Sequence, residues 1–335
     1  MLCAGLWLGY RTLAYTLRPD DEGVRTRLEG FYAEAPGSLD AVFIGSSAVY
    51  AYISPPRLYL DTGIRSYLYA TPNQSVEMIR YAIRECRRTQ PDALYVIELR
   101  AMLSSAQDRE AIAADMRRMT DNMPYTLNRM QMIHDLAPEK DRFSWYFDLV
   151  KYHERWKEAH MEDVRWTWGQ RNEWKGWSFS QCTQQIELRD YGRINARIQP
   201  DEENEEDFRQ LLAYCKEQNV SAVFLATPFP VSRRQVKIYN AVGDMAAESG
   251  YPFWNLCREF SRIGLDGDTD FADEHHVNTQ GALKTTRYLE ERFPELLPAG
   301  KAGNIQEQYG PFLLSEEDYL EAERKSLEEL QKNGS

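Results

Sequence analysis

The stretch Asp40-Ala41-Val42-Phe43-Ile44-Gly45-Ser46-Ser47 decides the fold, because it joins a short apolar run to two hydroxyl-bearing residues. A run of this length and content is typical of a buried strand, and the glycine and serines after it are turn residues. The carboxyl ends of parallel strands form the edge at which open α/β sheets bind their ligands. The stretch therefore predicts a strand over residues 40–45 that presents a hydroxyl group at this edge.

Four further apolar segments have the character of strands, and they alternate with helical patterns. The predicted strands cover residues 64–70, 93–99, 221–226 and 251–256. The helical patterns cover residues 73–89, a segment ending at Gln218, and residues 231–249 and 278–292. Such alternation is typical of βαβ units. We therefore expect a three-layer α/β/α fold around a mostly parallel five-stranded sheet.

The segment between the third and fourth predicted strands is too long for an ordinary connection. It predicts a large insertion over about residues 102–200, mostly helical up to residue 163 and aromatic and irregular from 166 to 193. We expect this insertion to pack over the carboxyl edge of the sheet. The tryptophans of the aromatic segment either stack on sugar rings or close a small core, and we favour the core. They are Trp166, Trp168, Trp174 and Trp177.

The two ends of the chain differ from this α/β region, which we place at residues 31–298. Residues 1–30 begin with an apolar run that Arg11 interrupts. This run is shorter than the roughly 20 residues needed to span a bilayer. It predicts either a helix packed on the domain or the outer end of a signal anchor that starts upstream. Residues 299–335 predict a linker and a charged, solvent-facing helix.

Composition excludes several classes of protein. The chain has 335 residues, 27% of them charged, and a net charge of -12, whereas a nucleic-acid-binding protein needs a basic surface. Its five cysteines include no C-x-x-C pair, which excludes a zinc finger. Asp266, Asp268 and Asp270 alternate in a loop, but a calcium site needs more oxygen ligands, so we expect a solvated turn. We expect no metal, organic cofactor or nucleic-acid partner.

A second stretch, Phe271-Ala272-Asp273-Glu274-His275-His276-Val277-Asn278, contains two of the five histidines. A serine hydroxyl becomes a good nucleophile only beside a base such as imidazole, and a carboxylate orients that imidazole. Because Asp273 and His276 stand three residues apart, one tight turn can bring both into a site. Two other interpretations stay open: a serine that caps a helix, which is favoured when Gly-Ser-Ser is considered alone, and a histidine satisfied by a local carboxylate.

The Phe-Ile-Gly-Ser-Ser strand end together with the late Asp-x-x-His resembles the SGNH (GDSL-like) hydrolase superfamily. Within it, the chain is most similar to the cell-envelope branch that includes the D-alanyl transfer protein of teichoic-acid modification and alginate-type O-acetyltransferases. The resemblance spans roughly residues 35–100 and 220–295. It implies that Ser47 is the nucleophile, His276 the base and Asp273 the acid, with His275 as a bystander.

The chain departs from the family's pattern at the oxyanion hole. Ala70 stands where the family has a glycine that donates its backbone N–H, and Glu98-Leu99-Arg100 lacks the family's asparagine. An oxyanion hole would therefore be built from the Ser47 N–H, the loop from Ala70 to Asn73, and the side chain of Gln74.

Two other groups of residues have alternative interpretations. Arg100 either pairs with Glu98 or neutralises an anionic substrate group, and we favour the ion pair. His153 and Trp156 look like a site, but at helical spacing they are expected to share a packed face.

The resemblance implies a serine esterase or O-acyltransferase that acts on acylated polysaccharides of the cell envelope. It also implies an extracytoplasmic location, with the N-terminus associated with a membrane. Two alternatives are a non-catalytic envelope scaffold with a degenerate site and a cytoplasmic esterase.

Overall fold

In a computed structural model, the chain forms two compact units. The structure describes residues 2–19, 23–104, 109–158, 160, 163, 170–189, 191, 194–297 and 309–333. The N-terminal unit combines residues 1–34 with residues 107–172, and the sheet unit combines residues 35–106 with residues 173–335. Residues 107–172 of the predicted insertion thus fold with the N-terminal segment, whereas residues 173–200 belong to the sheet unit.

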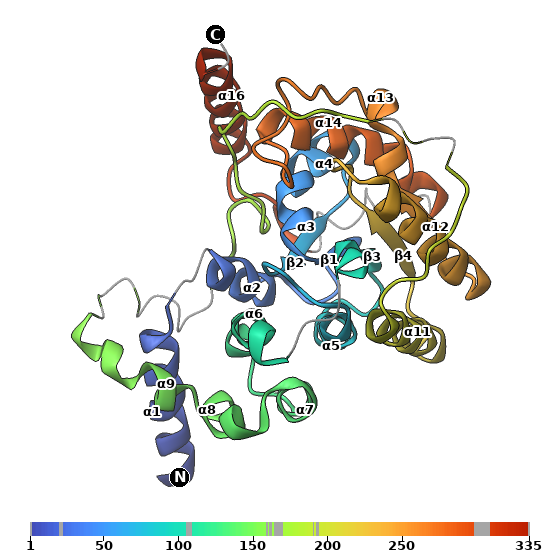
Figure 1. Cartoon of the computed structure of the whole chain (residues 1–335). Helices are drawn as coiled ribbons and strands as arrows, with labels where there is room; N and C mark the ends of the chain where they lie inside the picture. Colours follow the sequence, from blue (N-terminus) through green and yellow to red (C-terminus); the bar gives the residue numbers. More distant parts are fainter. Residues whose placement is uncertain are drawn as a thin grey trace. The chain divides into compact units, whose positions relative to one another are not determined.

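The sheet unit contains a five-stranded parallel sheet with the strand order β2-β1-β3-β4-β5 (Figure 1). Its strands are β1 (Ala41–Gly45), β2 (Ser66–Ala70), β3 (Leu94–Glu98), β4 (Ala222–Ala226) and β5 (Phe253–Asn255). All four neighbouring pairs are parallel, so the predicted fold class is confirmed. In the register, Gly45 lies opposite Ala70 and Ile44 opposite Ile97. The ends of β1, β2 and β3 therefore reach the same edge of the sheet.

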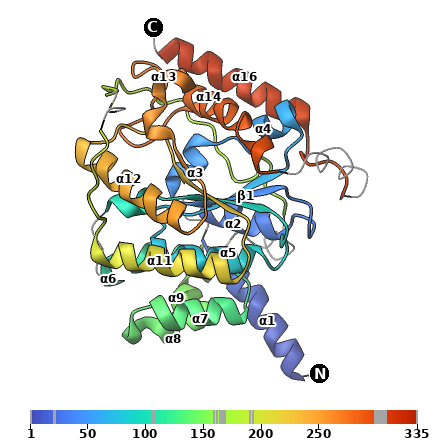
Figure 2. The same cartoon turned by 90° about the vertical axis from the view of Figure 1, so that its right-hand side faces the viewer.

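Helices cover both faces of this sheet (Figures 1 and 2). One face packs against α3 (Ser47–Tyr52), α4 (Pro55–Thr62), α12 (Arg233–Glu248), α13 (Phe260–Ile263) and α14 (Thr279–Glu290). The other face packs against α5 (Val76–Cys86) and α11 (Glu202–Glu217). Successive side chains of a strand point to opposite faces. Phe43 lies in the core that the sheet forms with α3 and α14, whereas Phe224 packs edge-on against Phe208 of α11. A strand buried on both faces is expected to be largely apolar, as the sequence suggested.

Short 3-10 segments and a terminal helix complete the sheet unit. The 3-10 segments are η1 (Arg100–Leu103), η5 (Leu256–Arg258) and η6 (Phe293–Glu295), and the terminal helix is α16 (Glu316–Asn333). The predicted solvent-facing character of α16 is wrong for one of its faces. Tyr319 is fully buried, Glu323 forms an ion pair with Arg57 at 2.5 Å, and Ser326 hydrogen-bonds to Thr279.

The aromatic segment of the predicted insertion is only partly described. Trp166 and Trp168 lie outside the described residues. Trp174 and Trp177 pack with Phe179 and with Tyr319 of α16, at ring-centroid distances between 4.4 and 6.1 Å. These two tryptophans thus close a small core, the role that we favoured.

The N-terminal unit is helical. It contains α1 (Leu2–Leu17), α2 (Val24–Tyr32), α6 (Arg109–Asn122), α7 (Leu127–Leu136), α8 (Arg142–Tyr146) and α9 (Asp148–Tyr152), with the 3-10 segments η2 (Glu139–Asp141) and η3 (His153–Lys157). No helix in the described part of the chain is both long and apolar enough to cross a membrane. The packed face predicted for His153 and Trp156 is wrong: the two residues share one side of η3, but that side is exposed.

Candidate active site

The turn after β1 gives two adjacent serines different tasks. A Cβ atom on Gly45 would lie 2.7 Å from Cβ of Glu98, so the chain can pass β3 this closely only with glycine. Ser46 caps α3 by accepting a hydrogen bond from the Ala48 N–H at 3.3 Å, and its own hydroxyl donates to Glu98 at 2.9 Å. The capping interpretation left open for Gly-Ser-Ser thus applies to Ser46, whereas Ser47 is the first residue of α3 and does not cap it.

The loop before α14 is fixed at both of its ends. Phe271 and Val277 pair in an antiparallel bridge, and the Asn278 N–H donates to the Asp270 carbonyl at 2.9 Å. The Asn278 side chain also caps α14 by accepting from the Gly281 N–H at 3.2 Å. The five residues between Phe271 and Val277 are therefore held in a turn that can present side chains in a defined orientation.

Asp270 holds the same loop through buried hydrogen bonds, so one prediction about the aspartates of this loop is wrong. We expected Asp266, Asp268 and Asp270 to form a solvated turn, but Asp270 is fully buried. It accepts hydrogen bonds from the Asp266 N–H at 2.7 Å and from Lys284 at 2.6 Å. Lys284 balances the charge of this carboxylate and the backbone N–H donates a hydrogen bond to it, so Asp270 has a structural role in the loop.

The structure brings Ser47, Asp273 and His276 together. Nε2 of His276 lies 2.8 Å from the Ser47 hydroxyl, and Nδ1 lies 2.9 and 3.0 Å from the two Asp273 oxygens. Asp273 also accepts from the backbone N–H groups of His275 and His276 at 2.7 and 2.9 Å. Ser47 and His276 are 229 positions apart in the sequence. The three side chains nevertheless form one continuous series of hydrogen bonds.

The hydrogen bonds that Asp273 accepts favour its ionised form. Partial burial raises the pKa of Asp273, but the hydrogen bonds from His276 and from the two backbone N–H groups outweigh it and lower the pKa below its usual value. A carboxylate in this position holds the Nδ1–H tautomer of His276, which leaves Nε2 able to accept a proton from Ser47.

Two residues clamp the backbone of the histidine loop. The carbonyl oxygen of His275 accepts hydrogen bonds from the Tyr52 hydroxyl at 3.0 Å and from Nη1 of Arg100 at 2.9 Å. Tyr52 belongs to α3, the helix that Ser47 begins, so it connects the predicted nucleophile's helix to the predicted base's loop. Tyr52 could not be predicted from the sequence, because its partner is a backbone carbonyl and no side-chain pattern indicates such a contact.

Arg100 is placed differently from the ion pair that we favoured. Besides the His275 carbonyl, its guanidinium contacts the Thr227 hydroxyl at 3.3 Å and stacks over Phe229 at 4.1 Å. Glu98 instead accepts the backbone N–H of Arg100 at 2.6 Å. Burial raises the pKa of Glu98, although the nearby Arg100 charge opposes the rise.

The predicted oxyanion residues lie in the turn after β2. Ala70 is buried opposite Gly45, and the next N–H, that of Thr71, donates to the Gly45 carbonyl at 3.3 Å. Asn73 is exposed and has a φ of 49°, a left-handed conformation that asparagine tolerates. Gln74 is only 2% exposed, and neither polar atom of its amide has a hydrogen-bond partner among the described residues. Gln74 is therefore the member of this set with unused hydrogen-bonding capacity.

The described residues include no group of three His, Cys, Asp or Glu side chains that could hold a metal ion. The five cysteines are free thiols, three of them buried. Comparison of the chain with models of known protein families and with curated proteins finds no match. Functional inference therefore rests on the site's geometry.

Proposed function

We propose that this protein is a serine esterase or O-acyltransferase of the SGNH type, with Ser47, His276 and Asp273 as its catalytic triad. The observation that carries the proposal is the hydrogen-bonded chain from the Ser47 hydroxyl through His276 to Asp273, at 2.8 and 2.9 Å. The engagement of Ser46 in capping α3 and binding Glu98 supports the choice of Ser47 as nucleophile.

In this proposal, Ser47 attacks the carbonyl carbon of an ester while Nε2 of His276 takes the hydroxyl proton. The carbonyl π electrons move to oxygen, and a tetrahedral oxyanion forms. When it collapses, the bond to the leaving alcohol breaks and His276 returns the proton to that alcohol's oxygen. Asp273 stabilises the imidazolium during both proton transfers without taking the proton itself.

The acyl-Ser47 ester is then attacked by water or by a sugar hydroxyl, with His276 again acting as base and then acid. Hydrolysis and transfer differ only in which hydroxyl the site admits. The oxyanion is assigned to the N–H of Ser47, which as a first-turn amide has no acceptor inside α3, and to the Gln74 side chain.

The substrate class that we propose is an acylated polysaccharide or a similar ester of the cell envelope. The side chains of Asp273 and His276 are 50% and 30% exposed, so a bulky polymer can reach them. The net charge of -12 favours a substrate other than a polyanion such as nucleic acid.

Two assays test the proposal. The first measures steady-state hydrolysis of 4-nitrophenyl acetate, and the second measures acetate release from an acetylated polysaccharide. We expect turnover by the wild type and loss of it in Ser47→Ala, with no loss in Ser221→Ala, which removes an exposed serine of the same unit. A folded wild type that turns over neither ester would contradict the enzyme and favour the non-catalytic scaffold. Adding a sugar acceptor separates transfer from hydrolysis.

A further inference from the structure

Exposed apolar side chains are concentrated in the N-terminal unit. Among the described residues, twelve large hydrophobic side chains are exposed, and ten of them belong to this unit, which holds less than a third of the chain. The ten are Leu6, Trp7, Leu8, Leu13, Leu127, Met130, Phe143, Phe147, Val150 and Trp156. An exposed apolar patch points to an interaction surface, so the question is which of these side chains lie together.

The first turns of α1 are exposed and apolar on every side. Residues 3–9 are all exposed and none of them is charged. Leu6, Trp7 and Leu8 follow one another at about 100° per residue, so they point in three different directions. A protein partner that binds one side of a helix would leave the other sides in water, whereas lipid can surround all of them.

A chain of aromatic rings connects α1 to α8. Trp7 contacts Tyr10 and Tyr125 at 5.6 and 5.1 Å, Tyr10 contacts Phe147 at 6.4 Å, and Phe147 contacts Phe143 at 5.0 Å. We call these five residues the aromatic face. Tryptophan and tyrosine are the residues that membrane proteins place at the level of the lipid headgroups.

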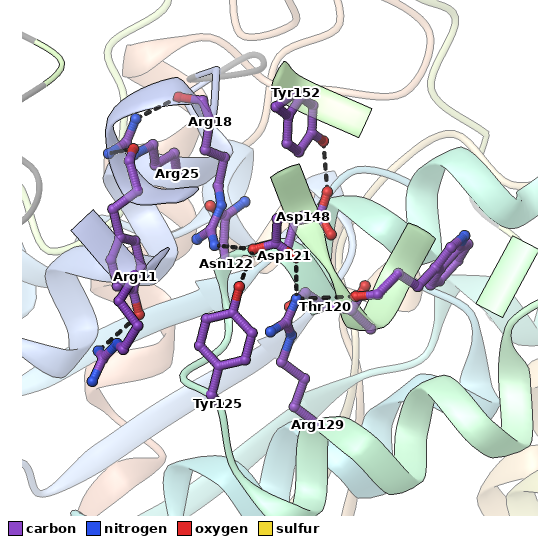
Figure 3. A network of polar contacts seen from close by, with 12 residues as sticks. Arg11, Arg18, Arg25, Thr120, Asp121, Asn122, Tyr125, Arg129, Asp148 and Tyr152 are labelled. Atoms are coloured by element: carbon purple, nitrogen blue, oxygen red, sulfur yellow. Dashed lines mark hydrogen bonds and ion pairs between the residues drawn. The ribbon is translucent and has the colours of Figure 1, made fainter. Parts of the chain in front are cut away.

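A buried polar network fixes α1 in its orientation within the unit (Figure 3). Asp148 at the start of α9 accepts hydrogen bonds from Arg18 at 2.7 Å, Arg129 at 2.5 Å and Tyr125 at 2.8 Å. Arg25 of α2 donates to the carbonyls of Arg18 and Tyr15 at the end of α1. Because these contacts tie α1 to α2, α7 and α9, the apolar turns of α1 and the aromatic face form one preorganised surface.

The charge of the two units also differs. The N-terminal unit has 15 Lys and Arg against 17 Asp and Glu, a net charge of -2 out of the chain's -12. The remaining charge of -10 belongs to the sheet unit. A negatively charged bilayer therefore repels the sheet unit much more than the N-terminal unit.

We propose that the N-terminal unit binds to the surface of a phospholipid bilayer, with the first turns of α1 and the aromatic face buried in the headgroup and upper acyl region. Apolar burial drives this binding, because the unit's small net charge gives little attraction to anionic lipid. The proposal goes beyond the proposed catalytic function and does not require it.

Flotation of the full chain with phosphatidylcholine vesicles, and with equimolar phosphatidylethanolamine and phosphatidylglycerol vesicles, tests this proposal. We expect the wild type to float with both and to resist moderate salt. The double variants Leu6→Ser/Leu8→Ser on α1 and Phe143→Ser/Val150→Ser on α8 and α9 should each bind roughly tenfold more weakly or worse. The matched control Leu314→Ser/Leu320→Ser removes the two exposed apolar side chains of the sheet unit and should bind like the wild type.

Circular dichroism confirms that each variant is folded. A folded wild type that stays with neither kind of vesicle would overturn the proposal, as would sedimentation showing a dimer that the α1 variant dissociates. Equal loss of binding in the control would overturn the assignment to this surface. Ser47→Ala should float like the wild type, so failure of membrane binding and failure of catalysis are read separately.

Discussion

At the scale of single residues, some of the hydrogen bonds that form the site could be predicted from the sequence and others could not. Ser47, Asp273 and His276 could be predicted, because a strand end and a tight turn carry them in short patterns, and the structure places the His276 imidazole within 3.0 Å of both the Ser47 hydroxyl and the Asp273 carboxylate. Tyr52 and the actual contacts of Arg100 could not be predicted, since both bind the backbone carbonyl of His275. The catalytic roles of Ser47, Asp273 and His276 stay predictions.

Tyr52 is predicted to be a positioning residue that acts through the histidine loop. Tyr52→Phe removes one hydrogen bond to the His275 carbonyl, which is worth about 1 kcal/mol, so we expect kcat to fall about fivefold with KM unchanged. The matched control is Tyr239→Phe, because the buried Tyr239 hydroxyl has no partner in the described structure. An equal loss of kcat in the control, or a change confined to KM, would contradict positioning.

Gln74 is predicted to donate to the oxyanion. Gln74→Ala should lower kcat by about 10²–10³-fold, the usual cost of losing one such donor, while Asn73→Ala, which changes the exposed neighbour, should leave kcat within about twofold. Steady-state ester hydrolysis measures both. If Asn73→Ala loses the rate and Gln74→Ala keeps it, the donor has been assigned to the wrong side chain.

At the scale of elements, the N-terminal unit is held together by buried charge. Arg18 and Arg129 are each about 1% exposed, and both bind Asp148, which is fully buried. Burial raises the pKa of Asp148, but the two guanidinium groups outweigh it and lower the pKa below the usual value of 3.8. The sequence could not predict this grouping, because Arg18 and Asp148 lie 130 positions apart and neither stands in a distinctive local pattern.

Asp148→Asn is expected to cost about 3–5 kcal/mol of unfolding free energy, because it removes the carboxylate that Arg18 and Arg129 share and leaves Arg18 with Glu29 as its acidic partner. Denaturant unfolding of the full chain measures this, with Asp141→Asn on a half-exposed carboxylate as the control. Since the pKa of Asp148 is lowered by folding, its stabilisation is present above the usual pKa and is lost as the pH falls below it. The acid side of the stability profile should therefore be flatter in Asp148→Asn, and an unchanged profile would contradict this account.

At the scale of the whole molecule, the five strands and the α/β class could be predicted, because a strand buried on both faces is largely apolar along its length. The division into two units could not, because the helical pattern over residues 109–158 shows amphipathic helices without showing what they pack against. The burial of one face of α16 was missed for a similar reason: only two of its four buried residues, Tyr319 and Leu330, are apolar, and the helix is otherwise strongly charged.

The pH dependence of global stability should show the effect of one acidic pair. Burial, followed by the nearby Asp61 carboxylate, raises the pKa of Glu290 on α14 to about 7. The folded state then holds a proton that the unfolded state releases at lower pH, so this group's contribution to stability falls as the pH rises from its usual pKa towards about 7. Thermal unfolding should show that fall in the wild type and a smaller one in Glu290→Gln. A variant profile parallel to the wild type would show that the pair does not matter.

The central claim is that Ser47 is an activated nucleophile, and a fluorophosphonate probe tests it most directly. The account predicts that the folded wild type is labelled, that the modified peptide carries the probe on Ser47, and that Asp273→Asn is labelled much more slowly. Ser47→Ala should not be labelled. Absence of label on the folded wild type, or label on Ser46 in place of Ser47, would contradict the account.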